Sequence, residues 1–331
     1  MATLILHGGA GRIDADRVDA YERGLRAALD DGWTVLQAGG EALDAVVAAV
    51  GAMEANPAAF NAGVGSSPTR DGTVECDACL MDGRDGRSGA VAVVSRARSP
   101  IALARTVMEH SPHVLIAGAG ADALVDEPIA NAELLTPHAS AQLARWRERR
   151  AGGATLPTGS ATVGAVALDD HGALAAATST GGVLGQWPGR VGDAPIPGAG
   201  TYADARVAVS CTGKGEAFLR AVTAKALAER LAAGTALEAA LARALAEVSA
   251  MGGSGGLIVA LSDGRLAWAF DTSHLALAWR SDGVAAGQNR PSEGPDGGSG
   301  DALAGARAAA REHVTVATEP GVCVPDLRSL A

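Results

Sequence analysis

The sequence predicts a fold in which sheets and helices stack in layers. Short apolar runs typical of buried strands occur in both halves of the chain, and two consecutive helical patterns separate the later runs. A succession of strands, helices and strands again is typical of layered folds. Aromatic residues make up only 3% of the chain and Gly occupies 44 of 331 positions, so small side chains must fill much of the core.

The first half of the chain alternates strand and helix patterns. Residues 152–160, at its end, show no hydrophobic period and are predicted to form a loop. The expected elements are a strand at 4–7, helices at 18–31 and 42–53, strands at 74–81 and 89–95, a helix at 100–109, a buried strand at 114–117 and a polar helix at 138–150.

The second half begins with a strand–turn–strand pattern directly after Thr162. Beyond about residue 284 the pattern weakens: 287–300 is rich in Gly, Pro and Ser, 302–310 is helix-like and 314–317 is strand-like. No role is assigned to this tail, residues 284–331. The expected elements before it are strands at 163–168, 173–178 and 207–211, helices at 215–233 and 236–250, and a hairpin of strands at 257–261 and 266–270.

Composition and charge exclude several classes of protein. Hydrophobic residues make up 48% and charged residues 19%, which allows a sizeable core. The formal net charge of −10 argues against non-specific binding to nucleic acid or to anionic membranes. No apolar run is long enough to span a bilayer, and residues 3–6 are too short and lack the basic flank of a signal peptide. We therefore expect a cytoplasmic protein with neither nucleic-acid nor membrane partners.

The four cysteines are Cys76, Cys79, Cys211 and Cys323. The spacing of Cys76 and Cys79 is compatible with a zinc or redox site. A zinc site needs a second pair of ligands, and no His or Cys pair stands at a suitable spacing. Buried reduced thiols are therefore the preferred interpretation.

The most informative motif is Thr162, which opens a strand of small apolar residues. A lone Thr at a loop-to-strand junction usually does no more than mark the start of the strand, but several further motifs accompany this one. Downstream lie Thr-Ser-Thr-Gly-Gly at 178–182, Pro-Gly-Arg-Val-Gly-Asp at 188–193 and Ser-Cys-Thr-Gly-Lys-Gly-Glu at 210–216. Upstream lie His-Gly-Gly-Ala-Gly at 7–11, Phe-Asn-Ala-Gly at 60–63, Asp-Ala-Cys-Leu-Met-Asp-Gly at 77–83 and Ser-Pro-His-Val at 111–114.

In this order the motifs resemble those of the plant-type asparaginase and isoaspartyl peptidase family of N-terminal-nucleophile hydrolases. The resemblance covers residues from about 3 to about 280. It implies an α+β fold, a four-layer αββα sandwich with two antiparallel sheets between layers of helices. It also implies hydrolysis of L-asparagine to L-aspartate and ammonia and of β-aspartyl dipeptides, no cofactor for catalysis, and a homodimer of cleaved αβ units.

A Thr hydroxyl becomes a nucleophile only when a base takes its proton. Among the seven histidines, only His171 lies in a matching segment near Thr162, and it sits in a turn. The α-amine of an N-terminal Thr, with a reference pKa of about 7.7 to 8.0, is an alternative base. The resemblance thus implies self-cleavage between Ala161 and Thr162 into segments 1–161 and 162–331, which remain one composite domain. Family members usually carry Gly or Asp before the Thr, so we expect slower cleavage here.

Three residues correspond to groups that assist the nucleophile in the family. Thr180 would hydrogen-bond and orient it, although a Thr at a strand end also caps its own backbone. The hydroxyl of Thr212 and the N–H of Gly213 would form the oxyanion hole, each worth about 3 kcal/mol. The alternative for the last two is a glycine turn before a helix.

Arg190 and Asp193 correspond to the family's substrate clamp. An aspartyl substrate joined through its side chain keeps a free α-carboxylate and a free α-ammonium. Arg190 would grip the carboxylate with two parallel hydrogen bonds, and Asp193 would pair with the ammonium, helped by the backbone at Gly215. The alternative is a surface ion pair of little energy. Pro188 and Gly192 indicate a shaped loop, which favours the clamp.

Asn61 lies in a loop that resembles the family's sodium-binding loop. Asn61 itself would support the active site or hold its own loop. The resemblance implies a structural Na⁺ bound by backbone carbonyls, and the matching positions are Glu54, Ala55, Pro57, Phe60, Ala62 and Val64.

Three residues have no catalytic assignment. His7 is expected to pack beneath the site, and His113 to be structural. Lys214 departs from the family pattern, where a small or polar residue such as Thr is usual. Its charge would favour acidic leaving groups or lower the pKa of a nearby amine, unless the side chain points into solvent.

Two other functions are compatible with the motifs. One is an amidase of the same fold that acts on glycosylated asparagine, but the motifs at 7–11 and 111–114 favour the first reading. The other is an uncleaved relative that serves as a binding or scaffold protein, which Ala161, Lys214 and the unusual tail would mark. All the chemical positions are nevertheless present, so we prefer an enzyme.

Overall fold

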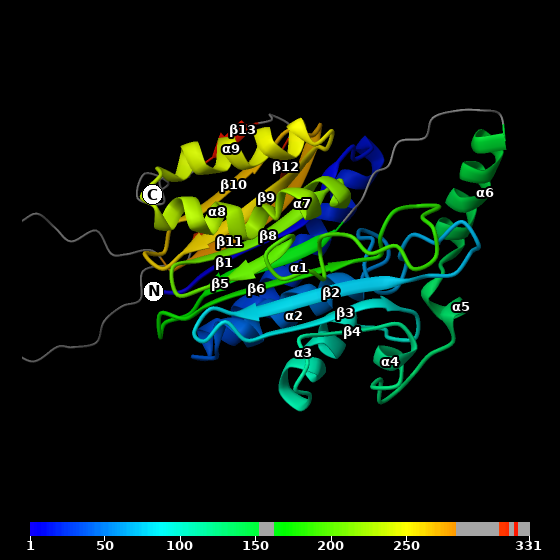
Figure 1. Ribbon diagram of the computed structural model, residues 1–331, viewed down its shortest axis with the longest axis horizontal. Coiled ribbons are helices and arrows are strands. Elements are labelled where there is room, and N and C mark those ends of the chain that lie inside the picture. The colour runs from blue at the N-terminus through cyan, green and yellow to red at the C-terminus, as the bar shows by residue number, and fades with distance from the viewer. Residues whose placement is uncertain (152–161, 283–310, 318–320, 324–331) are drawn as a thin grey trace, which may run out of the picture.

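The computed structural model describes residues 1–151, 162–282, 311–317 and 321–323. In this part of the chain, two stacked sheets lie between two layers of helices (Figure 1). The larger sheet has the strand order β12-β11-β1-β5-β6-β2-β3-β4, and the smaller one β13-β10-β9-β8-β7. The predicted α+β fold with stacked sheets is confirmed.

The strands of the larger sheet are β1 (Thr3–Gly11), β2 (Cys76–Asp82), β3 (Ser88–Val94), β4 (Leu115–Ala117), β5 (Val163–Leu168), β6 (Leu174–Thr180), β11 (His274–Ser281) and β12 (Arg311–Ala317). Those of the smaller sheet are β7 (Thr201–Ala203), β8 (Val207–Gly213), β9 (Gly255–Leu261), β10 (Leu266–Phe270) and β13 (Gly321–Cys323). Neighbouring strands are antiparallel except β3 and β4, which are parallel.

The helices form two groups, one on each outer face. The longer helices over the larger sheet are α1 (Val18–Gln37), α2 (Ala42–Glu54) and α3 (Pro100–His110), and those over the smaller sheet are α7 (Gly215–Ala221), α8 (Thr223–Ala232) and α9 (Leu237–Ala250). Short elements complete the first half, namely the 3₁₀ helix η1 (Ala15–Arg17), α4 (Ala119–Asp122) and α5 (Asn131–Leu134), followed by α6 (Pro137–Ala151).

Three apolar cores separate the four layers. One lies between α1, α2, α3 and the larger sheet, one between the two sheets, and one beneath α7, α8 and α9. Strand β1 shows the principle, because Leu4 and Leu6 belong to the core under the helices, whereas Ile5 belongs to the core between the sheets. Alternate side chains of a strand point to opposite faces, so a strand buried on both faces is apolar throughout.

Small residues allow these layers to approach closely. A Cβ on Gly32 of α1 would lie 2.9 Å from the carbonyl oxygen of Ala45 and 3.0 Å from the Cβ of Ala49, both on α2. A glycine is therefore needed at this crossing of two helices.

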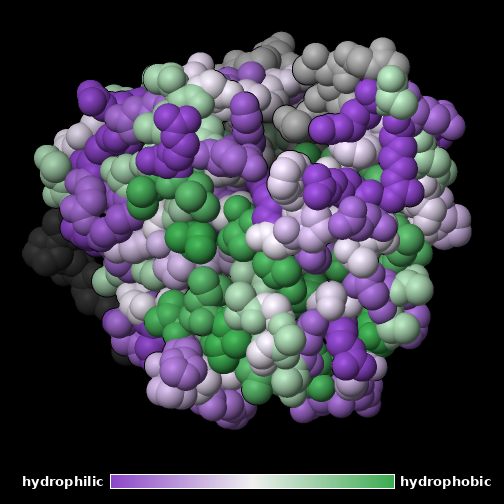
Figure 2. Space-filling model, turned by 45° about the vertical axis from the view of Figure 1, so that its right-hand side comes forward, coloured by the Kyte–Doolittle hydropathy of each residue, from purple (hydrophilic) through white to green (hydrophobic). Residues whose placement is uncertain are grey.

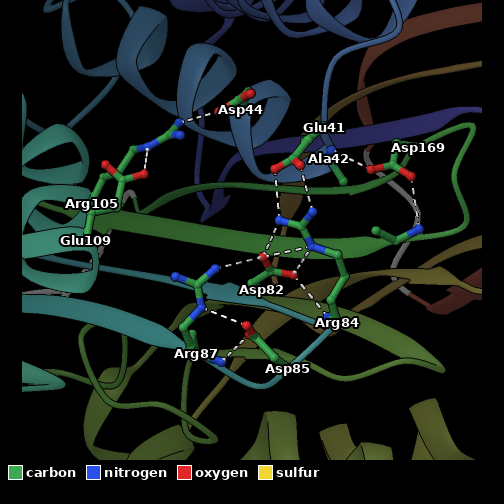
Figure 3. A network of polar contacts seen from close by, with 11 residues as sticks. Glu41, Ala42, Asp44, Asp82, Arg84, Asp85, Arg87, Arg105, Glu109 and Asp169 are labelled. Atoms are coloured by element: carbon green, nitrogen blue, oxygen red, sulfur yellow. Dashed lines mark hydrogen bonds and ion pairs between the residues drawn. The ribbon is translucent and has the colours of Figure 1, made fainter.

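A polar network holds the N-terminus of α2 at one end of the larger sheet (Figure 3). The backbone N–H of Ala42 donates to the buried carboxylate of Asp169 at 2.9 Å, which caps the helix. Arg84 binds Glu41 at 2.7 Å and the buried Asp82 at 2.6 Å. Asp82 pairs with Ala175 on β6, and Ala175 also pairs with Ala167 near the end of β5. The network therefore lies at the opposite end of the sheet from the start of β5.

Two expected elements differ from the structure. The strand predicted as buried at 114–117 is the short strand β4, whose residues are largely exposed because it forms the outer edge of the sheet. The single helix predicted at 215–233 is broken at Val222, which has a φ of 48°. The break turns α8 so that its first N–H groups bond the carbonyls of Ala199 and Gly198.

Three strands were not predicted, namely β7, β11 and β13, and two strands, β12 and β13, lie in residues 284–331. Strands β7 and β11 were missed; β11 is rich in Leu and Ala, which favour helices. Strand β12 confirms the predicted strand at 314–317 and extends it, and it pairs with β11, while β13 pairs with β10. The predicted linker at 287–300 and helix at 302–310 lie outside the described residues.

The surface of the described part carries several exposed apolar side chains. Apolar residues gather on one face of the molecule (Figure 2). Exposed large apolar side chains include Val114 and Leu115 at β4 and Trp187. No helix within the described ranges is long and apolar enough to cross a bilayer.

Candidate active site

Thr162 stands directly before β5, in the interior of the molecule. Its side chain is buried, and its Oγ1 donates a hydrogen bond of 3.1 Å to Oγ1 of Thr180. Thr180 ends the neighbouring strand β6 and also accepts a bond of 3.1 Å from the N–H of Gly182. The two threonines therefore lie together, as expected from the sequence. Ala161, the other side of the predicted cleavage site, lies outside the described residues.

His7 lies beneath Thr162 and holds its backbone. The Nδ1 atom is 3.2 Å from the carbonyl oxygen of Thr162, and Nε2 is 2.9 Å from Oγ of Ser210 on β8. A carbonyl only accepts, so Nδ1 carries the proton and Nε2 accepts from the hydroxyl of Ser210. Burial lowers the pKa of His7 to about 3, against the opposing effect of the bond to Thr162, so the ring is neutral.

This arrangement depends on a glycine between the sheets. A Cβ on Gly164 would lie 2.0 Å from Oγ of Ser210 and 2.4 Å from Nε2 of His7. Ser210 in turn lies 2.7 Å from the hydroxyl of Thr178 on β6. His7 thus positions Thr162 through its backbone, and both ring nitrogens have partners other than the Thr162 hydroxyl.

Thr212 and Gly213 end β8, in the sheet that packs against β5. Thr212 is fully buried, and its Oγ1 accepts a hydrogen bond of 3.3 Å from the N–H of Ala10. A hydroxyl that accepts one bond keeps its proton for donation. Gly213 has a φ of 146°, and a Cβ there would lie 2.4 Å from the carbonyl oxygen of Ser254.

Arg190, Asp193 and Gly215 lie against one another. A Cβ on Gly215 would be 2.8 Å from Nη2 of Arg190 and 2.8 Å from Oδ1 of Asp193. Arg190 is held by Glu216, whose Oε1 accepts from its Nε at 3.0 Å. Sequence reasoning missed Glu216, although it ends the quoted motif at 210–216.

Asp193 is an unusual carboxylate. Its side chain is 4% exposed, and its Oδ2 atom has no hydrogen-bond partner among the described residues. Burial raises its pKa to about 7, although Arg190 opposes this shift. A buried carboxylate oxygen without a partner is costly, so the described part of the chain leaves room here for a cation or a hydrogen-bond donor.

Asp77 is a second carboxylate that the sequence did not reveal. It accepts hydrogen bonds from the N–H groups of Val93 at 2.8 Å and Gly192 at 3.4 Å. Burial raises its pKa to about 6, against these two bonds. Asp77 therefore ties the loop that carries the clamp to the sheet.

Asn61 fixes the turn that follows Thr180. Its Nδ2 donates to the carbonyl of Gly182 at 3.1 Å, its own carbonyl accepts from Gly181 at 3.0 Å, and its Oδ1 accepts from Ser67 at 2.5 Å. Because Gly182 in turn donates to Thr180, the position of Asn61 affects the orientation of the second threonine.

The predicted cation loop begins at Glu54, whose side chain has a different task. Its carboxylate accepts from Ser179 at 2.6 Å, Ser99 at 2.5 Å and the N–H of Ile101 at 2.9 Å, and burial raises its pKa to about 7. The carbonyl of Glu54 accepts a bond of 3.1 Å from Val64. Within the described ranges, the other five proposed carbonyls accept no hydrogen bond, which fits oxygen ligands for a hard cation: Ala55, Pro57, Phe60, Ala62 and Val64.

The remaining assignments concern residues around the site. Lys214 is exposed, and its Nζ donates to the carbonyl of Gly252 at 2.9 Å, which agrees with the solvent-facing alternative. His113 is exposed in the loop before β4. Cys76, Cys79 and Cys211 are buried and free, as predicted, and the side chain of Cys323 is not described.

Comparison with known proteins agrees with this geometry. The sequence matches the family described as asparaginase over residues 1–286. The chain belongs to the asparaginase family. It is 43% identical to the isoaspartyl peptidase of Salmonella typhimurium over 299 residues, 84% of this chain and 95% of the relative. It is 40% identical to the plant-type L-asparaginase of Pyrobaculum calidifontis over 300 residues, 86% of this chain and 98% of that one. It is 39% identical to the isoaspartyl peptidase/L-asparaginase of Mus musculus over 284 residues, 83% and 86% of the two chains.

Proposed function

We propose that the protein is a threonine amidohydrolase that cleaves L-asparagine to L-aspartate and ammonia and hydrolyses β-aspartyl dipeptides. One oxygen of Asp193, beside Arg190, has no partner in the described part of the chain, and it carries this proposal because it marks a place for a group with both a positive and a negative charge. The names of the relatives, isoaspartyl peptidase and L-asparaginase, agree with such a substrate.

The clamp selects the aspartyl head by complementary charge. Arg190 binds the α-carboxylate, and Asp193 binds the α-ammonium through the oxygen that lacks a partner. The ammonium restores the ionised form of Asp193, whose pKa burial raises to about 7 in the free protein. The β-carbonyl then extends from the clamp toward Thr162.

The reaction passes through an ester on Thr162. Its α-amine takes the hydroxyl proton, and Oγ1 attacks the β-carbonyl carbon, which becomes tetrahedral. The negative oxygen receives hydrogen bonds from the hydroxyl of Thr212 and the N–H of Gly213. The amine returns the proton to the leaving nitrogen, the C–N bond breaks, and water then hydrolyses the ester by the same steps.

The α-amine of Thr162 exists only after the chain is cleaved. In the precursor, Oγ1 of Thr162 attacks the carbonyl carbon of Ala161. The C–N bond breaks as the nitrogen takes up the hydroxyl proton, which gives an ester and a free α-amine, and water then hydrolyses the ester. Thr180, bonded to Oγ1 at 3.1 Å, orients this attack as well. Ala161 is expected to slow the step because it tolerates less backbone strain than Gly.

An assay with matched substrates tests the activity. The parent protein is expected to release aspartate from L-asparagine and from β-Asp-Leu, whereas α-Asp-Leu, which presents its carbonyl at the wrong distance from the clamp, stays intact. A Thr162→Val variant lacks the hydroxyl and should lose both activities, with rates at least about 1,000-fold lower. Hydrolysis of either substrate by that variant at the parent's rate would contradict the proposal.

Three further predictions rest on the family alone. A cation held by the carbonyls of the loop at 54–64 would stabilise the loop that carries Asn61 and take no part in the reaction. Assembly as an (αβ)₂ homodimer is the second, and a cytoplasmic location is the third.

A further inference from the structure

A cavity of about 360 Å³ lies beside the reaction centre. Its wall is formed by the loop at the end of β1, the start of α1, the loop after α2 and the first turns of α6. This volume is within the range of sites that bind small molecules. The residues that give the cavity its chemical character are Arg12, Arg17, Tyr21, Phe60, His138 and Gln142.

The cavity touches the reaction centre at two points. Ala10 lines it and donates to the hydroxyl of Thr212, and Asn61 lines it and holds the turn after Thr180. None of the clamp residues lines it. In an amide, the acyl part and the leaving amine lie on opposite sides of the scissile bond. The leaving amine of a substrate whose head occupies the clamp therefore points away from the clamp, and this cavity, which no clamp residue lines, borders the same reaction centre.

The cavity carries positive charge in a chain of negative net charge. The charged residues of its described lining are Arg12 and Arg17, with no Asp or Glu, although the formal charge of the whole chain is −10. Arg12 also pairs with Asp14 at 3.1 Å on the exposed surface. A carboxylate inside the cavity would thus meet positive charge and no lining residue that repels it.

Arg17 is the better placed of the two arginines. Its guanidinium stands 5.2 Å from the ring centroid of Tyr21, and its Nη2 donates to the carbonyls of Ala58 at 3.3 Å and Ala59 at 3.0 Å. These contacts hold the group in place, while Nε and Nη1 make no hydrogen bond within the described ranges. A fixed guanidinium with two available donors suits a carboxylate.

We propose that this cavity is the subsite for the leaving amino acid of a β-aspartyl dipeptide, with Arg17 and Arg12 receiving its α-carboxylate. Phe60 and Ile13 supply apolar surface for its side chain. The inference rests on the proposed function and narrows its peptide substrates to dipeptides with a free C-terminal carboxylate. Asparagine, which releases ammonia, makes no use of this subsite.

Two substrates that differ by one charge test the subsite. The value of kcat/KM for β-Asp-Leu is expected to exceed that for β-Asp-leucinamide at least tenfold. Leucinamide is the less basic amine and hence the better leaving group, so leaving-group chemistry would favour the opposite order. Equal values, or a preference for the amide, would overturn the subsite. Failure to hydrolyse L-asparagine and both of these peptides would instead overturn the proposed function.

Variants assign the effect to the arginines. The ratio of kcat/KM for β-Asp-Leu to kcat/KM for β-Asp-leucinamide should fall in both Arg17→Gln and Arg12→Gln. In Arg17→Gln it should come within threefold of one. Because both substrates are measured on one preparation, the ratio does not depend on how much protein folds. Arg23→Gln removes the same charge from α1 outside the cavity and should keep the parent ratio. An unchanged ratio in both cavity variants would contradict the assignment.

Discussion

At the scale of single residues, the site depends on groups whose burial changes their ionisation. His7 is neutral because it is buried, and it therefore serves as a fixed donor to the backbone of Thr162. Asp193 is buried, its Oδ2 has no partner among the residues that the structure describes, and it lies next to Arg190 and within the electrostatic influence of Glu216 and Asp77. In the proposed mechanism, His7 positions the nucleophile and Asp193 pairs with the ammonium of the substrate.

The raised pKa of Asp193 predicts a pH-dependent affinity for the product L-aspartate. Only the ionised carboxylate pairs with the ammonium, so binding weakens as the pH falls through a pKa of about 7. From the fraction ionised, the Kd for L-aspartate should rise about 50-fold between pH 7 and pH 5. Isothermal titration calorimetry measures this change directly.

The control for this prediction is Asp193→Asn, which cannot ionise at that position. Its affinity for L-aspartate should be weak and should change far less with pH. A parent protein whose Kd stays constant between pH 7 and pH 5 would show that Asp193 does not pair with the ammonium.

At the scale of elements, α2 connects the two ends of the larger sheet. Its N-terminus is held by Asp169 and, through Glu41, by Arg84, whereas its last residue Glu54 binds Ser179 beside Thr180. Strands β5, β6 and β2 run between the same ends. The polar network of Figure 3 therefore stabilises the helix that supports the site, at a distance from the chemistry.

Removal of Arg84 is expected to destabilise the protein without removing activity. Arg84→Gln removes the guanidinium that lies nearest to the buried Asp82, whose side chain is 2% exposed and which keeps Arg87 at 3.9 Å, and it also removes the partner of the half-exposed Glu41. We expect the free energy of unfolding in urea to fall by about 2 kcal/mol, since only one of the carboxylates is buried. As a control, Arg265→Gln breaks an exposed pair with Asp263 and should change it by less than about 0.5 kcal/mol. Equal effects of the two substitutions would contradict the role of the network.

Local patterns predicted most elements, and the exceptions depend on distant contacts. The small apolar runs around β5 and β6 were sufficient to place Thr162 at the start of a strand. The break at Val222 was not predictable, because it is compensated by bonds to the loop at 198–199. Strand β11 carries residues that favour helices, and only its position between β1 and β12 makes it a strand.

The same distinction applies to the site. Thr162, Thr180, Arg190 and Asp193 stand in motifs that can be read along the chain. The roles of Asp77, Glu54 and Glu216 depend on partners far away in sequence, such as Gly192 for Asp77 and Ser99 for Glu54. The spacing of residues along the chain does not predict such pairs.

At the scale of the whole molecule, segments on both sides of Thr162 share one sheet. Strand β1 lies between β11 and β5, and it pairs with β5 from Thr3 opposite Leu168 to His7 opposite Gly164. A break before Thr162 would thus leave both products joined by a continuous sheet and by the cores on its two faces. This arrangement permits the chain to be cut at its active site and remain folded.

The central claim is that Thr162 becomes the first residue of a chain, and intact-mass spectrometry of the purified protein tests it most directly. We predict two polypeptides, one of which begins at Thr162, and a single intact polypeptide for Thr162→Val. A fully active parent protein that shows only the mass of the uncut 331-residue chain would contradict the account.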